Sequence, residues 1–296
     1  MDMKNKIRNI IISTTSSIKK HKNCYTTMGT FGYILRRQIN YMNDKMYYDK
    51  MKEIEKFLKS DENKLFCKPY ILDCERITKI ANEYNGKNDL LFEQLDQNIT
   101  NIKYASGGEG LHRGFYCPSP VLDIVVGGIK RGKLLIQLRK NSKPSYKYGF
   151  DDKNNLITVE YLHFKYFYKE IVITNNNHEI GIAFTKNSHV ETISECIYEN
   201  NRIVSYIFCI YDSYDNIISE YTKEVYEYSK EGLEKVDMFL FMNNKNAPFL
   251  NHDQFVFTHD NEGYLSSYIV KEFKNAKEIL NPYTNHKYDV YIKRKV

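Results

Sequence analysis

The chain has 296 residues, of which 42% are hydrophobic and 14% aromatic, so it is long and apolar enough to bury a substantial core. This composition excludes a disordered segment and a small disulfide-stapled scaffold. The longest strongly apolar runs, such as residues 121–126, are far shorter than the roughly 20 residues that cross a bilayer, so we expect no membrane partner.

The formal net charge of +6 conceals a difference between the two halves of the chain. Residues 1–150 contain 27 Lys and Arg against 15 Asp and Glu, whereas residues 151–296 contain 16 against 22. The halves therefore carry net charges of +12 and −6. Opposite charges allow the halves to dock on each other or to face separate partners, and ordinary solvated faces also explain them.

The six cysteines are scattered, without paired spacing or histidines at ligand spacing. We therefore expect buried, reduced thiols, no metal site and no cofactor. The first residues are basic, but the apolar patch at residues 10–12 is too short for the core of a signal peptide. These features predict a cytoplasmic protein.

Residues 1–105 are predicted to form a helical region. Several stretches carry apolar side chains at helical spacing, with charged residues on the opposite side. A small helical bundle fits this pattern. The stretches are residues 7–18, residues 43–60 with Asn43 and Asp44 as N-cap candidates, residues 77–84 and residues 91–99, the last two separated by the turn signal Asn85-Gly86.

Residues 106–145 are predicted to form a glycine-rich, basic junction. Residues 106–150 hold eight of the fourteen glycines and three of the six prolines. Ser119 and Pro120 suit the N-cap and first position of a short helix. Residues 121–126 fit a strand nearly as well, so both alternatives stay open.

From residue 146 to residue 296 the pattern has a period of two, and Tyr, Ile and Phe alternate with polar residues between clusters of Asp, Asn and Gly. Such alternation, bounded by residues that tolerate positive φ, predicts successive β-hairpins. The sequence therefore predicts an α+β protein, with an N-terminal helical region followed by a long antiparallel β-meander sheet. The expected turns are residues 151–155, 175–178, 200–201, 212–216, 230–232 and 260–263.

Several hairpin units share an aromatic pair, a polar turn and a Leu that begins the return strand. Residues 148–156 are YGFDDKNNL, residues 226–233 are YEYSKEGL, and residues 255–265 are the looser FVFTHDNEGYL. This layout resembles the tyrosine-aspartate (YD) repeats of bacterial Rhs and polymorphic toxin proteins, although Ser229 stands where the family has Asp. Over residues 105–296, the resemblance to proteins of toxin–immunity systems implies a cognate protein toxin as the partner.

The junction holds the anion-binding candidates. Its glycine-rich residues 107–114 allow backbone N–H groups to converge on an anion, beside His112 and Arg113. Lys130 and Arg131 follow on a predicted turn and extend the basic patch. Glycine is equally suited to bending the chain between domains, and the sequence lacks the P-loop and dinucleotide-binding patterns.

A nucleic-acid-binding or nucleic-acid-processing effector is the alternative function. Tyr116, Tyr146 and Tyr148 lie close in sequence to the basic patch, and aromatic rings beside cations suit single-stranded nucleic acid. However, alternating aromatic residues also pack strands, and the sequence pI of about 8.7 is below that of typical nucleic-acid binders.

Acidic residues and tyrosines are interspersed in residues 218–237, ISEYTKEVYEYSKEGLEKVD. Glu220 and Glu224 are separated by an even number of residues, so a strand would place them on one face. Carboxylates beside tyrosines suit a basic protein partner, and a solvated strand face is the alternative interpretation. The predicted partner-binding residues are Glu220, Glu224, Glu227, Tyr221, Tyr226 and Tyr228.

The sequence shows no convincing catalytic set. None of its eight histidines belongs to an HExxH, HxH or Cys/His ligand pattern, and no nucleophile is paired with a base. We therefore predict a non-catalytic protein-binding module, and most specifically an immunity protein that neutralises a cognate toxin through its sheet surface.

Overall fold

The computed structural model describes residues 56, 58–126, 129–164, 167–243, 248–274, 277–279 and 285–296. The helices predicted over residues 7–18 and most of residues 43–60 lie outside them. None of the described helices combines the length and apolar character needed to cross a membrane. The helical elements are α4 (Asp61–Tyr84), α5 (Asn88–Asp96), the 3-10 helix η1 (Gly114–Tyr116) and α6 (Leu122–Val125).

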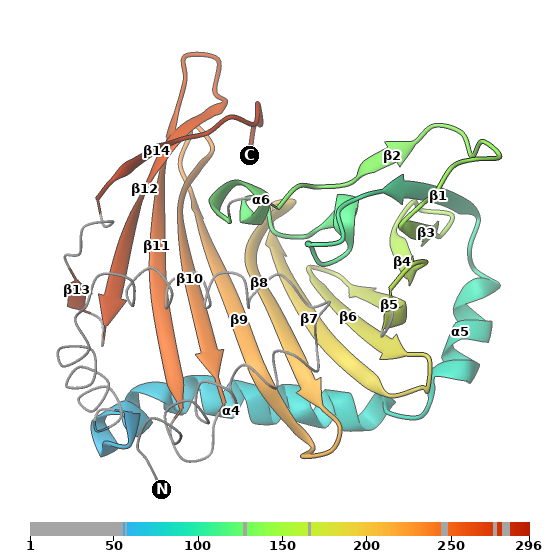
Figure 1. Cartoon of the computed structure of the whole chain (residues 1–296), viewed down its shortest axis with the longest axis horizontal. Helices are drawn as coiled ribbons and strands as arrows, with labels where there is room; N and C mark the ends of the chain where they lie inside the picture. The colour runs from blue at the N-terminus through green and yellow to red at the C-terminus, as the bar shows by residue number, and fades with distance from the viewer. Residues whose placement is uncertain are drawn as a thin grey trace, which may run out of the picture.

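The described strands form one fourteen-stranded antiparallel sheet (Figure 1). From β3 to β12 each strand pairs with the next in sequence, which confirms the predicted α+β meander. The strands are β1 (Asn101–Ser106), β2 (Lys133–Leu135), β3 (Tyr146–Phe150), β4 (Leu156–Tyr161), β5 (Phe167–Asn175), β6 (His178–Thr185), β7 (Val190–Glu199), β8 (Arg202–Asp212), β9 (Ile217–Tyr228), β10 (Leu233–Met242), β11 (Phe249–His259), β12 (Leu265–Lys274), β13 (Lys277–Ile279) and β14 (Lys287–Asp289).

The predicted turns connect consecutive strands of the meander. Between β7 and β8, Asn200 and Asn201 have φ of 50° and 62°, and Asn176 between β5 and β6 has φ of 51°. Positive φ at these positions gives the hairpin a twist that matches its strands, and asparagine tolerates it better than most residues. Local turn chemistry therefore sets the register of the meander.

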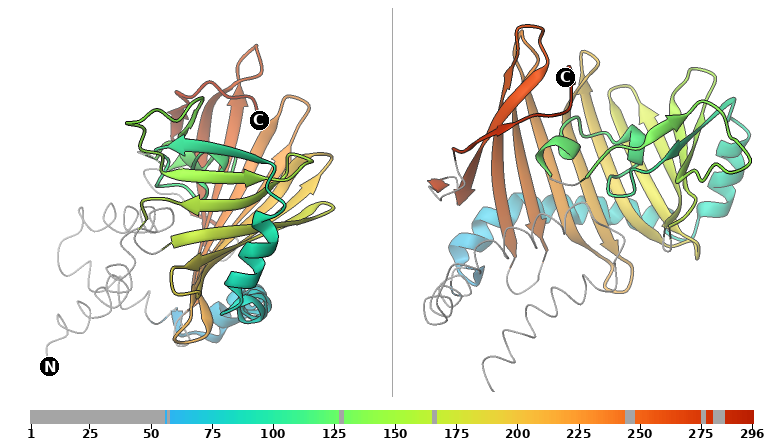
Figure 2. Two further views of the ribbon diagram at one scale, coloured as in Figure 1. Left: turned by 90° about the vertical axis from the view of Figure 1, so that its right-hand side faces the viewer. Right: turned by 45° about the horizontal axis from the view of Figure 1, so that its top comes forward.

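Helix α4 covers one face of the sheet and runs across its strands (Figures 1 and 2). Its buried residues include Cys74, Ile77 and Ala81, which pack into a core with residues from β5 to β10. Arg76 on the same helix donates to both carboxylate oxygens of Glu195 on β7, at 2.7 and 2.6 Å. The helix predicted over residues 77–84 is confirmed as the C-terminal part of α4.

The junction covers part of the opposite face, where η1 and α6 lie against the strands (Figure 2). Leu111 and Val121 are buried there in a core that includes Tyr206 and Phe208 of β8. The helical alternative for residues 121–126 is confirmed, because α6 forms within this segment. Both faces of the central strands are therefore covered.

Two strands, β1 and β2, were not predicted, and β2 lies in the segment expected to be a glycine-rich junction. Residues 101–105 fall in the region expected to be helical, yet β1 begins at Asn101 and lies between β3 and β2 in the sheet. Its register pairs Asn101 with Phe150 and Ala105 with Tyr146, more than forty residues away in sequence. Local helical spacing cannot reveal a pairing of this range, which explains the difference.

Candidate functional site

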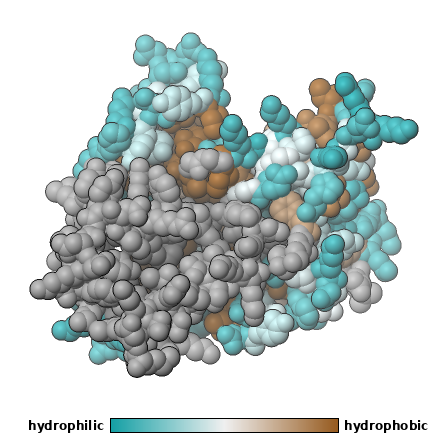
Figure 3. All heavy atoms as spheres, viewed as in Figure 1, coloured by the Kyte–Doolittle hydropathy of each residue, from teal (hydrophilic) through white to brown (hydrophobic). Residues whose placement is uncertain are grey.

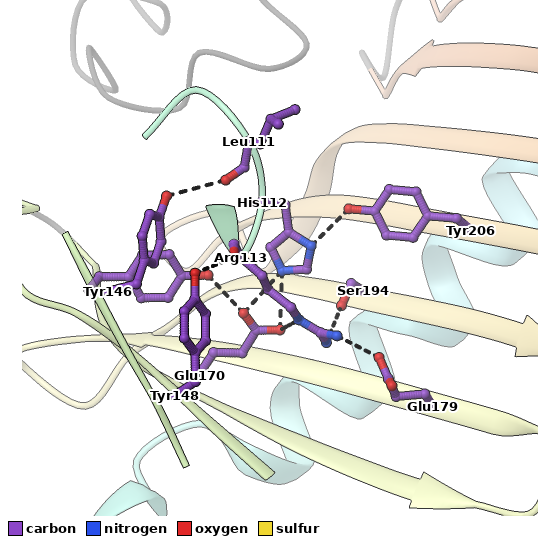
Figure 4. Close-up of polar contacts among 10 residues, drawn as sticks. Leu111, His112, Arg113, Tyr146, Tyr148, Glu170, Glu179, Ser194 and Tyr206 are labelled. Carbon is purple, nitrogen blue, oxygen red and sulfur yellow. Dashed lines mark hydrogen bonds and ion pairs between the residues drawn. The ribbon is translucent and has the colours of Figure 1, made fainter. Parts of the chain in front are cut away.

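A buried polar cluster fastens the junction to the sheet (Figure 4). Arg113 Nε donates to Glu170 Oε1 of β5 at 2.8 Å, and His112 Nε2 lies 3.0 Å from Glu170 Oε2. Arg113 is 2% exposed and Glu170 is fully buried. We refer to His112, Arg113, Tyr161, Glu170 and Tyr206 as the Glu170 cluster.

The charges in this cluster follow from its hydrogen bonds. Burial alone would raise the pKa of Glu170, but the positive charge of Arg113 and the surrounding donors outweigh burial and hold that pKa at about 2. Burial lowers the pKa of His112, so its imidazole is neutral and donates Nε2–H to the Glu170 carboxylate. His112 Nδ1 then accepts from the Tyr206 hydroxyl at 2.8 Å, and the Tyr161 hydroxyl donates to Glu170 at 2.7 Å.

Arg113 is held by further partners on the sheet. One terminal nitrogen donates to Glu179 at 2.5 Å and the other to Ser194 Oγ at 3.3 Å. Gly181 of β6 makes room for this arrangement, because a Cβ there would lie 2.1 Å from Glu170 Oε1. Arg113 itself has φ of 59°, a left-handed conformation that costs about 1–2 kcal/mol for most residues and is held here by these contacts.

Two tyrosines of β3 hold the junction backbone. The Tyr146 hydroxyl donates to the Gly108 carbonyl at 3.0 Å, and the Tyr148 hydroxyl donates to the Arg113 carbonyl at 2.9 Å. Both rings are fully buried, and Tyr116 packs edge-on against Tyr148 with ring centroids 4.8 Å apart. Tyr146 and Tyr148 therefore do not form the accessible stacking platform expected for a nucleic-acid ligand, because their rings complete the core under the junction.

A second anchor holds α6, the loop after it and the C-terminal residues together. Arg294 makes two contacts with the Asp123 carboxylate, at 2.7 and 2.8 Å. Arg131 Nε donates to the same carboxylate at 3.3 Å, and its terminal nitrogens donate to the carbonyls of Cys117, at 2.8 Å, and Ser119. We refer to Asp123, Arg131 and Arg294 as the Asp123 anchor.

Replacing Asp123 by Asn should lower the free energy of unfolding by about 1–3 kcal/mol, because two arginines lose their charged acceptor. Denaturant unfolding measures this change. The amides of Leu233 and Leu265, which donate to the carbonyls of Val296 and Arg294, should also exchange hydrogen faster. Asp152→Asn, at an exposed turn position, is the matched control. Unchanged exchange at both amides in D123N would contradict the anchor.

The predicted anion-binding residues do not form one open site. His112 and Arg113 are buried in the Glu170 cluster, and Arg131 is half-buried in the Asp123 anchor. Lys130 is exposed. The glycine-rich stretch therefore directs the Arg113 side chain into the sheet and away from solvent, where Glu170 supplies the compensating charge.

The predicted acidic row is not accessible. Glu220 and Glu224 share one face of β9, as their spacing predicts, but both are buried. Ser119 and Tyr226 donate to Glu224 Oε2 at 2.6 and 2.7 Å. The expectation of a surface row was wrong for these carboxylates, because β9 lies in the middle of a sheet that is covered on both faces.

The other predicted partner-binding residues are dispersed. Tyr221 is buried on the α4 face, where its hydroxyl donates to Asp73 at 2.6 Å. Tyr226 is buried, and Tyr228 is half-buried with its hydroxyl on a backbone carbonyl of β8. Glu227 is exposed. These residues belong to both faces of β9, so they do not combine into a single contact surface.

Most of the exposed residues of the junction lie in the segment of residues 129–143, which we call the arm. Leu134, Ile136 and Leu138 alternate along it and are 37%, 99% and 50% exposed. Figure 3 shows hydrophobic residues beside hydrophilic ones at the upper right, over the end of the sheet where Figure 1 places β2. The exposed cations of the arm are Lys130, Lys133, Arg139, Lys140 and Lys143.

Sequence reasoning recognised the cations of the arm but missed its exposed aliphatic residues. Alternating Leu and Ile ordinarily indicate a buried strand face, so exposure at Ile136 gave no local signal. The available signal was charge: residues 124–150 contain seven Lys and Arg and no Asp or Glu. A run of positively charged residues without acidic ones, beside alternating aliphatic residues, is unusual for a strand that is covered on both faces.

No protein-family model matches the sequence, and no curated protein shows significant similarity to it. Within the described residues, no group of three His, Cys, Asp or Glu side chains is placed to hold a metal ion.

Proposed function

We propose that the protein is a non-catalytic protein-binding module that contacts its partner through the arm. The observation that carries this proposal is the exposure of Leu134, Ile136 and Leu138 among cations, on a segment that the Asp123 anchor ties to the sheet. Apolar side chains rimmed by polar ones are typical of interaction sites. A fixed segment also loses little conformational entropy when it binds.

The state of the Glu170 cluster supports binding over catalysis. A general acid or base must reach a proton on its substrate. His112 uses both ring nitrogens for Tyr206 and Glu170, and Glu170 accepts from Arg113, His112 and Tyr161. These groups are buried beneath the junction and serve one another. Their hydrogen bonds therefore position the chain.

Neutralisation of a cognate toxin is the specific form of this function that we propose, and its support is the YD-like layout of residues 148–156 and 226–233. The acidic row that we expected to contact a basic toxin is buried, whereas the arm is cationic. We therefore propose an acidic contact surface on the partner.

Nucleic-acid binding is the second candidate, and the exposed cations of the arm favour it. The burial of Tyr146 and Tyr148 argues against it, because base stacking supplies much of the affinity for single strands. Filter binding across a salt series tests this candidate: retention of single-stranded DNA that falls steeply with salt would favour nucleic acid over protein.

Coexpression with the protein product of an adjacent gene, followed by affinity purification and calorimetry with the purified pair, tests the proposed function. We expect a stable complex that Ile136→Asp weakens at least about tenfold. Tyr214→Asp is the matched control, since Tyr214 is 98% exposed in the turn between β8 and β9. Absence of a complex, or equal affinity in both variants, would remove the arm as the contact surface.

A further inference from the structure

The sheet has an open edge at its β2 end. β1 pairs with β3 from Asn101 to Ala105, but with β2 only from Tyr104 to Ser106. Residues 101–103 therefore have a strand neighbour on one side only, within the part of the chain that the structure describes. β2 is itself the terminal strand of the sheet order, so its outer side has no described strand neighbour either.

Backbone directions on β1 follow from one hydrogen bond. The Ser145 amide donates to the Ala105 carbonyl at 2.8 Å, so the backbone groups of Ala105 point towards β3. Backbone N–H and C=O groups alternate between the two sides of an antiparallel strand. The backbone N–H and C=O of Tyr104 therefore point towards β2. Those of Ile102 point to the side of β1 that has no strand beside it in the described residues. Ile102 is also 46% exposed.

The same alternation assigns the directions on β2. Lys133 and Leu135 are opposite Ser106 and Tyr104, the residues of β1 that point towards β2. The backbone groups of Lys133 and Leu135 thus bond β1. Leu134, between them, directs its N–H and C=O outward. Among the described residues, Leu134 therefore directs an N–H and a C=O to the outer side of β2, where no strand pairs with them, next to the exposed side chains of Ile136 and Leu138.

The charge around this edge indicates which kind of molecule can bind there. Residues 124–150 carry seven cations and no acids, so two copies of the chain would repel each other here. A DNA backbone offers acceptors but no donor for the outward carbonyl of Leu134. An extended polypeptide with acidic residues supplies donors, acceptors and complementary charge at once.

We propose that an acidic, extended segment of a partner protein adds as a strand to the outer side of β2, with its apolar residues on Leu134, Ile136 and Leu138. This proposal rests on the proposed function and specifies its site and mode. Main-chain hydrogen bonds would give affinity, and alternate side chains would give specificity. The arm cations would speed encounter with acidic segments.

A labelled synthetic peptide in which Glu alternates with Val is the probe, and its binding to the full chain is measured by fluorescence anisotropy. Leu134→Pro removes the outward N–H, and Pro is tolerated on an edge strand where that group faces solvent. Leu134→Ala keeps the N–H and is the matched control. We expect Leu134→Pro to bind at least about tenfold more weakly than Leu134→Ala.

Thermal unfolding checks that both variants fold. A wild-type measurement with the same peptide, methylated on alternate backbone nitrogens, tests the mode without altering the protein, and methylation in one of the two registers should abolish binding. A Lys–Val peptide should not bind. Equal binding by L134P and L134A, or by methylated and unmethylated peptides, would overturn strand addition. If strand addition were overturned but Ile136→Asp still weakened the purified complex, the proposed function would stand without strand addition.

Discussion

Replacing Arg113 by Met should lower the free energy of unfolding by about 3–5 kcal/mol, because Glu170 would remain as an unpaired charge in the interior. Methionine replaces the aliphatic part of the arginine side chain, so most of the packing is kept. Urea unfolding measures the loss. Arg139→Met, at an exposed position of the arm, is the matched control and should stay within about 0.5 kcal/mol of wild type.

The pH dependence separates this charge effect from a packing effect. In the wild type the folded pKa of Glu170 is about 2, below its ordinary 4.5, so the cluster stabilises the fold above pH 4.5 and loses that contribution as pH falls towards 2. Without Arg113, burial raises the pKa of Glu170, and protonation removes the buried charge. The deficit of R113M should therefore shrink at acidic pH. A deficit below about 1 kcal/mol that is independent of pH would contradict this account of the cluster.

Replacing Glu224 by Gln should also change how the free energy of unfolding depends on pH. The contribution of Glu224 has the opposite sign to that of Glu170, because it is lost as pH rises. Burial raises the pKa of Glu224 from 4.5 to about 7, although Ser119, Tyr226 and Arg131 favour its charged form. The folded state then holds a proton that the unfolded state releases, so wild-type stability falls as pH rises from 4.5 through 7. A folded-state pKa of about 7, against 4.5 in the unfolded chain, corresponds to about 3 kcal/mol.

Glutamine stays neutral, so the stability of E224Q relative to wild type should rise by about 3 kcal/mol between about pH 4 and about pH 8. Unfolding in urea across this range measures it. Asp253, whose pKa burial also raises to about 7, contributes equally to both proteins and cancels in the comparison. A constant difference at all pH values would show that Glu224 is ionised in the folded state.

The meander was predictable because its determinants are local. Period-two alternation indicated the strands, and residues such as Asn200 and Asn201 indicated the turns, since tolerance of positive φ is a property of the residue type. Each strand then pairs with its sequence neighbour, so no long-range information was needed. Local chemistry left a helix and a strand open for residues 121–126. The helix α6 forms with Val121 as its N-cap, and Ser119 Oγ accepts from the Leu122 amide at 3.1 Å.

The candidate site was less predictable because its contacts are distant in sequence. Arg113 and Glu170 are 57 residues apart, and Ser119 and Glu224 are 105 apart. Sequence reasoning selected Arg113 for its charge and glycine-rich setting, but nothing local indicated that a carboxylate from β5 would neutralise it. The same limit affected β1, which forms through pairing with β3.

Burial of the acidic row had the same origin. Alternation placed Glu220 and Glu224 on one face correctly, but alternation alone does not say whether that face meets solvent. The answer depends on the junction and on α4, which cover the two faces of the central strands. Exposure of Ile136 is the converse case, an aliphatic residue left outside because the sheet ends at β2.

Hydrogen–deuterium exchange of the full chain, with and without the purified binding partner, tests the central claim most directly. The account predicts that binding slows exchange in residues 129–143, while the strands β7 to β10 stay unchanged. Slower exchange confined to β9 and its neighbours, with the arm unaffected, would contradict the account.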